Sequence, residues 1–133
     1  TLSSSSAASD VYKRQVLMSV PANLPFSKIR TAAGLAFLAG EMPFAADGSI
    51  PEGIAAQTDL TLERISATLA TAGLTLADVV SVTVFLTEKE DFAEFNKAYA
   101  AHFKDPLPVR ATVCSALMAP ARIEICVIAA LRN

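Results

Sequence analysis

PVRATV (residues 108–113) and RIEICVIA (residues 122–129) are the two stretches that decide the fold of this chain. Both have the apolar, β-branched composition of buried strands. Each nevertheless holds one charged residue in its apolar run, Arg110 in the first and Glu124 in the second. A guanidinium or a carboxylate is costly to bury unless it is paired or binds a ligand, and Arg110 has the forked geometry that binds a carboxylate. These two residues are therefore the first candidates for a functional site.

Length and composition indicate one globular domain. The chain has 133 residues, of which 53% are hydrophobic and 18% charged, so disorder is excluded for most of it. A net charge of −2 and the lack of a run of Lys or Arg argue against nucleic acid as the main ligand. No stretch approaches the roughly 18 apolar residues of a membrane span. Cys114 and Cys126 lie in apolar contexts without metal-type spacing, as expected for two reduced cysteines of a cytoplasmic protein.

The first seventeen residues have a different character. Residues 1–8 are rich in Ser and Ala and aperiodic, which predicts a disordered extension. Residues 10–15 (DVYKRQ) resemble a translated sequencing adapter, and no apolar core of a signal peptide follows a basic start. We therefore expect residues 1–17 to be an extension or an artefact of sequencing or assembly. The domain is expected at residues 18–133, with Met18 as the native start.

The remaining pattern alternates between strands and helices. Short apolar runs at 29–32 and 35–39 flank Ala33-Gly34 and predict a hairpin. Apolar residues spaced 3, 4 and 3 apart predict a helix over 54–72 that ends at Gly73. A strand at 78–86 follows, with Val80, Val82 and Val84 expected on one face.

A second helix is expected to start at Thr87-Glu88-Lys89-Glu90, which has the form of a capping box. Its aromatic stripe is interpreted as core packing and consists of Phe92, Phe95, Tyr99 and Phe103. Two prolines end this helix and lead into the strand of Arg110. A loop at 117–121 then joins the last strand, 122–131.

The resulting order is strand, strand, helix, strand, helix, strand, strand. It predicts an α+β fold with a mixed sheet and two helices on one face. The last strand lacks polar alternation, which is typical of a strand buried on both faces. Because the helices cover one face, the other must meet a second apolar surface, most simply another copy of the sheet. The sequence therefore predicts a homo-oligomer of undetermined order.

Period-two alternation places Arg110 and Thr112 on one face of their strand. If the strands of Arg110 and Glu124 are neighbours, the two charges could meet. They would then form either a buried ion pair that fixes register or a pocket in which an arginine grips a carboxylate beside an acid or base. Asn96 interrupts the aromatic stripe and is either solvated, bonded to backbone or in contact with a ligand. His102 has no Ser or Cys partner at recognisable spacing and is expected at the surface or at a helix end.

Motifs for bound groups are missing from the sequence. It contains no Gly-rich phosphate loop, no zinc-type cluster and no nucleophile elbow. Nothing in it calls for a cofactor or a metal.

Residues from about 24 to 132 resemble the Rid (YjgF/RidA) family of reactive-intermediate deaminases. The resemblance rests on stretches that recur in family order with near-family spacing. These are 39–43 (AGEMP), 56–58 (AQT), 78–87 (DVVSVTVFLT), 91–96 (DFAEFN) with Tyr99, 108–113 (PVRATV) and 123–125 (IEI).

The resemblance implies a chorismate-mutase-like α+β fold assembled as a homotrimer, with ligand clefts between subunits. It also implies cofactor-free hydrolysis of 2-imino or enamino acids, released by pyridoxal-phosphate enzymes, to 2-keto acids and ammonia. In such enzymes the residue matching Arg110 binds the substrate carboxylate, and the residue matching Glu124 positions the attacking water. The backbone around Gly40 and the side chain of Asn96 line the cleft.

The chain also departs from the family pattern. Phe26 replaces the usual tyrosine of the cleft, Thr112 stands where many members have cysteine or serine, and Ala39 stands where serine is common. These changes keep two alternatives open: a non-catalytic trimer that binds a small carboxylate as a sensor or regulator, and a pathway-specific deaminase of a larger enamine. Ribonuclease or translation-inhibitor activity has been attached to relatives, but the charge of −2 argues against it.

Overall fold

The fold was established with a computed structural model, which describes residues 24–133. The predicted extension at 1–17 and the predicted start at Met18 lie outside these residues.

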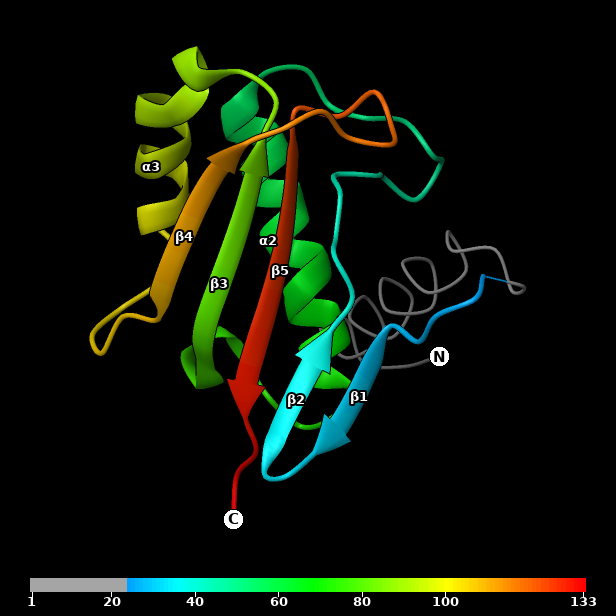
Figure 1. The fold of residues 1–133 in the computed structure, drawn as a ribbon, viewed down its shortest axis with the longest axis vertical. Coiled ribbons are helices and arrows are strands. Elements are labelled where there is room, and N and C mark those ends of the chain that lie inside the picture. The colour runs from blue at the N-terminus through cyan, green and yellow to red at the C-terminus, as the bar shows by residue number, and fades with distance from the viewer. Residues whose placement is uncertain (1–23) are drawn as a thin grey trace, which may run out of the picture.

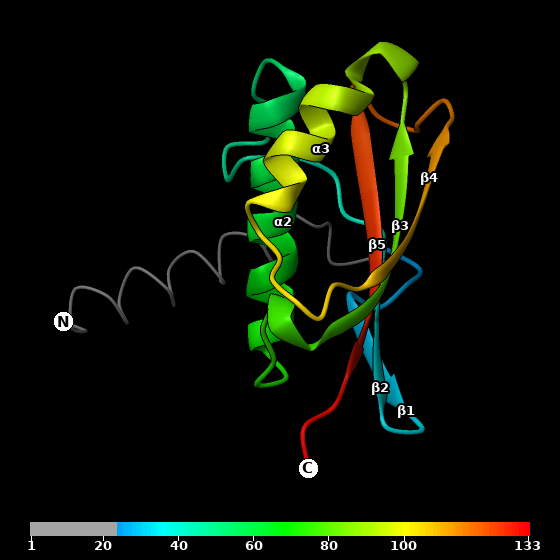
Figure 2. The ribbon, with the colours of Figure 1, turned by 90° about the vertical axis from the view of Figure 1, so that its left-hand side faces the viewer.

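The described chain forms one mixed sheet with two helices on one of its faces (Figures 1 and 2). The strands lie in the order β1-β2-β5-β3-β4, and β3 and β4 are parallel while the other pairs are antiparallel. This confirms the predicted α+β class and element order. The elements are β1 (Ile29–Ala32), β2 (Leu35–Leu38), α2 (Ile54–Ala70), β3 (Val79–Leu86), α3 (Phe92–Ala100), β4 (Val109–Cys114) and β5 (Ile123–Ala130).

The turn of the hairpin and the end of the first helix lie where the local residue types predict them. Ala33 and Gly34 have φ angles of 54° and 78°, as a type I′ turn between β1 and β2 requires. After α2 the N–H of Gly73 donates to the carbonyl of Ala70, and Gly73 has a φ of 73°. Glycine adopts this left-handed conformation without a steric cost, so it stops the helix as predicted.

The capping box predicted at residues 87–90 is wrong. The N–H of Thr87 donates to the carbonyl of Arg122 (3.1 Å), so the chain is still part of the sheet at this point. A 3₁₀ turn, Lys89–Asp91, has no side-chain cap and separates the strand from α3. A capping box is present instead at Thr75, where it begins the short 3₁₀ helix Leu76–Asp78 that precedes β3.

The predicted face of Val80 is also wrong. Val79 and Val82 are both buried, while Val80 is 44% exposed. The pairing of β3 with β5 shifts register between Val79 and Ser81, as a bulge does when it inserts an extra residue. From Val82 onward the predicted alternation holds.

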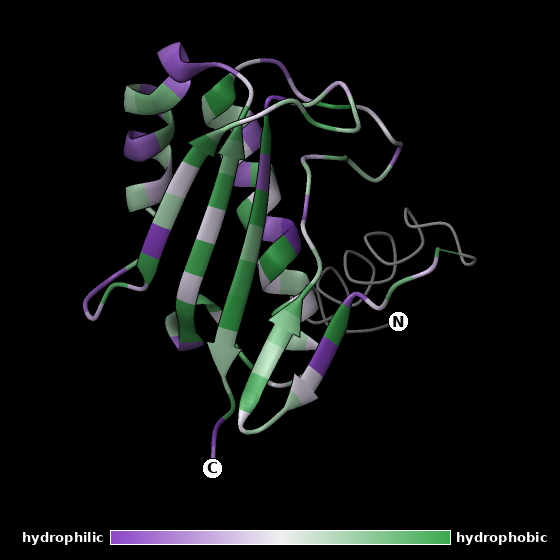
Figure 3. Cartoon of the chain, in the orientation of Figure 1, coloured by the Kyte–Doolittle hydropathy of each residue, from purple (hydrophilic) through white to green (hydrophobic). Residues whose placement is uncertain are grey.

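The sheet face opposite the helices, called here the open face, is uncovered in a single chain (Figure 2). Burial alternates along β5, so the predicted burial of this strand on both faces is not reached within one chain. The strands are nevertheless largely hydrophobic (Figure 3). By strand register the open face carries the large apolar residues Phe37, Phe85, Val109, Val113 and Ile128.

No helix of the described residues is both long and apolar enough to cross a membrane.

Candidate active site

Arg110 lies on the helix-facing side of the edge strand β4, and its guanidinium rests on the aromatic side chains of α3. Its Cζ is 4.8 Å from the ring centroid of Tyr99 and 5.1 Å from that of Phe95. Its Nη2 donates to Oδ1 of Asn96 at 2.7 Å. Cation–π contacts and a charge-assisted hydrogen bond therefore hold the guanidinium in place before a ligand arrives.

The aromatic stripe of α3 has a second role that the sequence analysis missed. Phe95 is fully buried and packs in the core, as predicted, but the same stripe also forms a platform under Arg110. A signal was present in the sequence, because the helix that carries this stripe leads directly into the strand that holds Arg110. The hydroxyl of Tyr99 is buried without a hydrogen-bond partner among the described residues. Burial raises the pKa of Tyr99, and the charge of Arg110 opposes this shift.

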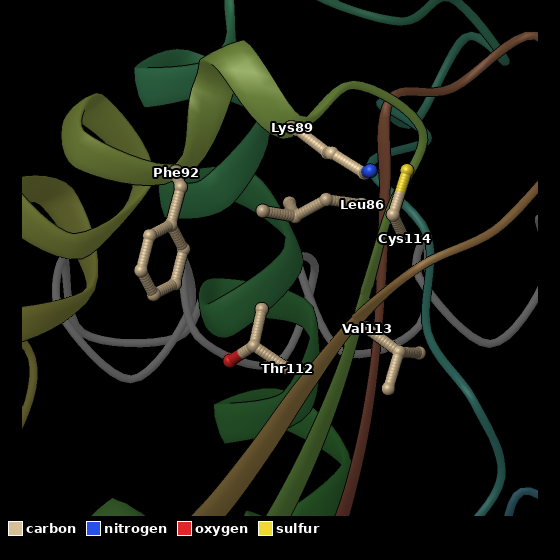
Figure 4. A pocket seen from close by; sticks show the side chains of 6 residues that line it. All are labelled: Leu86, Lys89, Phe92, Thr112, Val113 and Cys114. Atoms are coloured by element: carbon tan, nitrogen blue, oxygen red, sulfur yellow. The ribbon is translucent and has the colours of Figure 1, made fainter.

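Two hollows follow the groove between β4 and α3, one on each side of Arg110. The first, of about 300 Å³, is lined by Leu86, Lys89, Phe92, Thr112, Val113 and Cys114 (Figure 4). The second, of about 510 Å³, is lined by Asn96, Tyr99, Ala100, Phe103, Lys104, Asp105, Leu107 and Arg110. Oγ1 of Thr112 is buried and, like the Tyr99 hydroxyl, lacks a partner among the described residues. Polar atoms without partners on both sides of a cation are typical of a ligand site.

Glu124 lies against the backbone of Gly40. A Cβ added at Gly40 would lie 2.2 Å from Oε2 of Glu124, so this position has to be glycine for the carboxylate to stay where it is. The contact is fixed by the neighbouring residues, because Glu41 and Ile125 exchange both backbone hydrogen bonds, at 2.9 and 3.0 Å. The structure therefore brings together two of the predicted site residues, Gly40 and Glu124.

The carboxyl group of Glu124 is more basic than that of an ordinary glutamate. Burial raises its pKa, and the nearby charge of Glu41 raises it further. Glu41 itself is held by Lys28 at 2.6 Å and by Arg64 at 2.8 Å. A half-buried carboxylate with a raised pKa can orient a water molecule and accept its proton.

The predicted site residues thus form two groups within one chain. Arg110 pairs with Val82, whose side chain faces the helices, whereas Glu124 pairs with Phe85 on the open face. Strand β3 also separates β4 from β5. The prediction that Arg110 and Glu124 could meet as neighbours is therefore wrong for a single chain. The first group is Arg110, Asn96 and Thr112, and the second is Gly40 and Glu124.

Phe26 belongs by its position with the second group. It is 55% exposed and lies just before β1. The N–H of Ala39 donates to the carbonyl of Lys28 at 3.0 Å, so the segment that leads into β1 runs beside the Gly40 backbone.

The other candidates lie elsewhere. Nε2 of His102 is 2.7 Å from Oδ1 of Asp59, a side-chain hydrogen bond between α2 and the residues after α3. Within residues 24–133 no three His, Cys, Asp or Glu side chains gather so that they could hold a metal ion. Cys114 and Cys126 are free cysteines.

Comparisons with known proteins agree with this architecture. A family model described as "Endoribonuclease L-PSP" matches residues 17–131. The mitochondrial protein mmf2 of Schizosaccharomyces pombe is 35% identical over 91 residues, which cover 68% of this chain and 72% of that protein. A protein of Escherichia coli named "Putative reactive intermediate deaminase TdcF" is 35% identical over 72 residues, 53% of this chain and 56% of the other.

Solved structures show the same fold. The crystal structure of RidA from an Antarctic Psychrobacter superposes with a TM-score of 0.78 at 31% identity, covering 83% of this chain and 91% of that one. The match of the family model to nearly all of the described residues, together with these relatives, shows that the chain belongs to the Rid (YjgF/RidA) family.

Proposed function

We propose that this protein hydrolyses reactive 2-imino and enamino acids to 2-keto acids and ammonia without a cofactor. The observation that carries the proposal is the preorganised guanidinium of Arg110. It rests on the rings of Tyr99 and Phe95 and donates one hydrogen bond to Asn96. Its remaining N–H groups are available to bind a carboxylate in bidentate fashion. The name of the E. coli relative, a reactive intermediate deaminase, supports the same class of reaction.

The second group of residues completes the site from a neighbouring subunit. Arg110 and Glu124 lie on opposite sheet faces, so in an assembly the helix side of one β4 edge meets the open face of the next chain. The exposed apolar residues of the open face support such contacts. A homotrimer with three clefts between subunits would place Phe26, Gly40 and Glu124 of one chain opposite Arg110, Asn96 and Thr112 of the next.

The reaction balances without a redox partner. Arg110 holds the carboxylate so that water meets the imine carbon in near-attack geometry. A C–O bond forms as the C=N double bond opens, and Glu124 takes a proton from the water and passes it to the imine nitrogen, which gives a carbinolamine. Glu124 then takes the proton of the carbinolamine hydroxyl and passes it to the nitrogen. The C–N bond breaks, the nitrogen leaves as ammonia, and the oxygen becomes the carbonyl of the 2-keto acid. An enamino acid first tautomerises to the imine.

The departures from the family pattern affect the shape of the cleft rather than its charges. The hydroxyl of Thr112, which has no partner within the described part of the chain, is placed to bond a ligand held by Arg110. Phe26 offers a ring without a hydroxyl and therefore favours an apolar contact with the substrate.

The test uses imines made in situ. A serine or threonine dehydratase releases 2-iminopropanoate or 2-iminobutanoate, and keto-acid formation is followed in the presence of semicarbazide, which traps the imine. We expect the protein to accelerate keto-acid formation over buffer and Arg110→Ala to abolish the acceleration. Arg132→Ala is the control, because it removes the same charge from an exposed ion pair with Asp78 that contributes little. Full activity in Arg110→Ala would contradict the proposal.

A non-catalytic carboxylate binder is the second candidate, and the loss of a cleft hydroxyl at Phe26 favours it. For this candidate, 2-ketobutyrate raises the melting temperature while keto-acid formation stays at the rate in buffer. RNA cleavage, which the description of the family model names, is tested on the same preparations. With a net charge of −2 we expect no RNA cleavage, and cleavage that survives Arg110→Ala would argue for a different site.

We place the protein in the cytoplasm, where pyridoxal-phosphate enzymes release 2-imino and enamino acids.

A further inference from the structure

We propose that the site prefers 2-imino acids with a second carboxylate on their side chain, which binds Lys89; this inference rests on the proposed function. Lys89 lines the hollow of about 300 Å³ beside Arg110. The α-carboxylate of the substrate would bind Arg110, and its side chain would extend along β4 into this hollow.

The hollow is shaped for a chain with a polar end. Its walls include the apolar side chains of Leu86 and Phe92, and Phe92 also contacts the guanidinium of Arg110, whose Cζ is 6.0 Å from the ring centroid. Figure 4 shows Lys89 extending across one end of the hollow, with Thr112 at the opposite end below Phe92. A substrate anchored at Arg110 therefore passes Thr112 and Phe92 before it reaches the ammonium group.

A ligand anchored at Arg110 needs an extended side chain to enter the hollow. Arg110, Thr112 and Cys114 lie on the same face of β4, and four residues of a strand span about 13 Å. Thr112 and Cys114 line the hollow, so the side chain would run along β4 from Arg110 past Thr112.

The charges that line the two hollows also favour a substrate with a second carboxylate. The ammonium group of Lys89 makes no ion pair or hydrogen bond with any residue in the range 24–133, and Lys89 is the one charged residue among them that lines this hollow. Glu88 and Glu90 flank it in the chain but do not line the hollow. The other hollow is lined by Arg110 itself, which is assigned to the α-carboxylate, and by Lys104 and Asp105, whose opposite charges cancel. An anionic side chain is therefore favoured in the Lys89 hollow alone.

The experiment compares imines that differ in the second carboxylate. A D-aspartate oxidase with catalase produces 2-iminosuccinate or 2-iminoglutarate, and an amino-acid oxidase acting on 2-aminobutyrate produces 2-iminobutanoate. We expect kcat/KM to be about tenfold higher for the dicarboxylic imines, the gain of one partly exposed charged hydrogen bond. Lys89→Met, which keeps the apolar part of the side chain and removes the ammonium group, should remove this preference, and Lys89→Glu should reverse it.

Lys97→Met is the matched control, because it removes the same charge from an exposed position of α3 that lines neither hollow. The ratio of the two kcat/KM values should not change in this variant. Binding is measured in parallel as the shift in melting temperature caused by 2-oxoglutarate and by 2-oxobutyrate, with the larger shift expected for 2-oxoglutarate in the unsubstituted protein and lost in Lys89→Met.

The outcomes separate the two proposals. If no imine is hydrolysed faster than in buffer, the deaminase function fails, and the melting shifts alone decide whether Lys89 binds a second carboxylate. If imines are hydrolysed but the substrate ratio is the same in the unsubstituted protein and Lys89→Met, the function stands and the role of Lys89 is overturned.

Discussion

Arg110 shows how a single side chain is made ready for a ligand before the ligand arrives. A free arginine loses up to about 2 kcal/mol of rotamer entropy when it is fixed in one position. The ring contacts contribute about 0.5–2 kcal/mol and the hydrogen bond to Asn96 about 1.5–3 kcal/mol, so together they offset this loss within the chain. In the proposed reaction, the substrate carboxylate would bind a guanidinium that is already in position.

Two substitutions of Tyr99 distinguish the role of its ring from that of its hydroxyl. We expect Tyr99→Leu to raise KM for an imino acid about 5- to 30-fold, because the guanidinium loses the ring beneath it. Tyr99→Phe keeps the ring and removes a buried hydroxyl that has no partner among residues 24–133, so its KM should stay near that of the unsubstituted protein. Its free energy of unfolding should be equal or higher by up to about 1 kcal/mol. Steady-state kinetics and urea unfolding measure the two quantities.

The opposite result for Tyr99→Phe would be informative. A loss of more than about 1 kcal/mol would mean that the hydroxyl finds a partner in the assembled protein, and the role of the ring would then have to be judged from Tyr99→Leu alone.

A substitution of Gly40 should lower activity with little effect on stability. In Gly40→Ala the new Cβ displaces the Glu124 carboxylate, whose Oε2 would be only 2.2 Å away. The displaced group is the end of a flexible side chain, so we expect the melting temperature to change by only a few degrees while kcat falls at least about tenfold. In a Glu124→Gln background the same substitution should have little further effect on kcat. Independent, multiplying losses would show that Gly40 acts through something other than Glu124.

The raised pKa of Glu124 predicts a defined pH dependence. As the proposed base, Glu124 must be ionised, so kcat/KM should fall as the pH drops through a pKa above the ordinary value of 4.5. Glu41→Gln removes the charge that contributes to the shift and should move this acid limb to lower pH. An unmoved acid limb would show that burial alone sets the pKa.

The same shift has a consequence for stability. The native state binds this proton more tightly than the unfolded state, so the contribution of Glu124 to the free energy of unfolding is fully present below the unfolded pKa. It is lost as the pH rises through the folded pKa. Glu124→Gln does not titrate, so its stability relative to the unsubstituted protein should increase over this window of pH.

At the scale of elements, α2 carries a charge into the core. Arg64 is 2% exposed, and it binds Oε1 of Glu41 and the carbonyl of Phe44, at 2.8 and 2.6 Å. These bonds connect α2 to the segment that follows β2, and this segment holds Gly40 in position beside Glu124. The element that covers the sheet therefore also fixes one half of the proposed site.

Arg64→Met should cost about 3–5 kcal/mol of unfolding free energy, because Glu41 stays buried with one of its two cationic partners removed. Lys28→Met should cost less, about 1–2 kcal/mol, since the more deeply buried pair with Arg64 remains. Glu63→Met on the exposed side of the same helix should stay within about 0.5 kcal/mol. Urea unfolding measures all three, and equal costs for Arg64 and Glu63 would contradict the buried network.

Elements governed by local rules were predictable from the sequence. The Ala33-Gly34 turn and the Gly73 helix end depend on the φ angles of those residues, which the residue types themselves favour. The bulge at Val80 and the missing cap at Thr87 depend on pairing with β5 and with Arg122, far away in the chain. A local pattern contains no information about such partners, so these two predictions failed.

The candidate site was predictable as a set of residue types but not as an arrangement. Alternation placed Arg110 and Thr112 on one face correctly, as their pairing with Val82 and Val84 shows. The relation of Arg110 to Glu124 depends on the strand order, because β3 lies between β4 and β5 and the two side chains face opposite ways. Strand order is a property of the folded chain that hydrophobic periodicity does not encode.

At the scale of the whole molecule, the opposite placement of Arg110 and Glu124 leads to a test of the assembly. If each cleft takes Arg110 from one chain and Glu124 from the next, a chain with Arg110→Ala and a chain with Glu124→Ala are both inactive alone. Every mixed ring of three, whichever chain is doubled, has one junction at which both intact residues face each other. Mixed trimers should therefore show about a third of the activity of the unsubstituted trimer.

The two chains are co-expressed with different affinity tags, mixed trimers are purified through both tags, and keto-acid formation is measured per trimer. A chain carrying both substitutions, mixed with the unsubstituted chain, is the control, because its trimers keep an intact cleft only where two unsubstituted chains adjoin. If both residues served one cleft within a chain, the mixture of single variants would be inactive, and every unsubstituted chain in the control would stay active. The two mixtures together thus decide whether the helix side of β4 and the open face form the active site only when they belong to different chains.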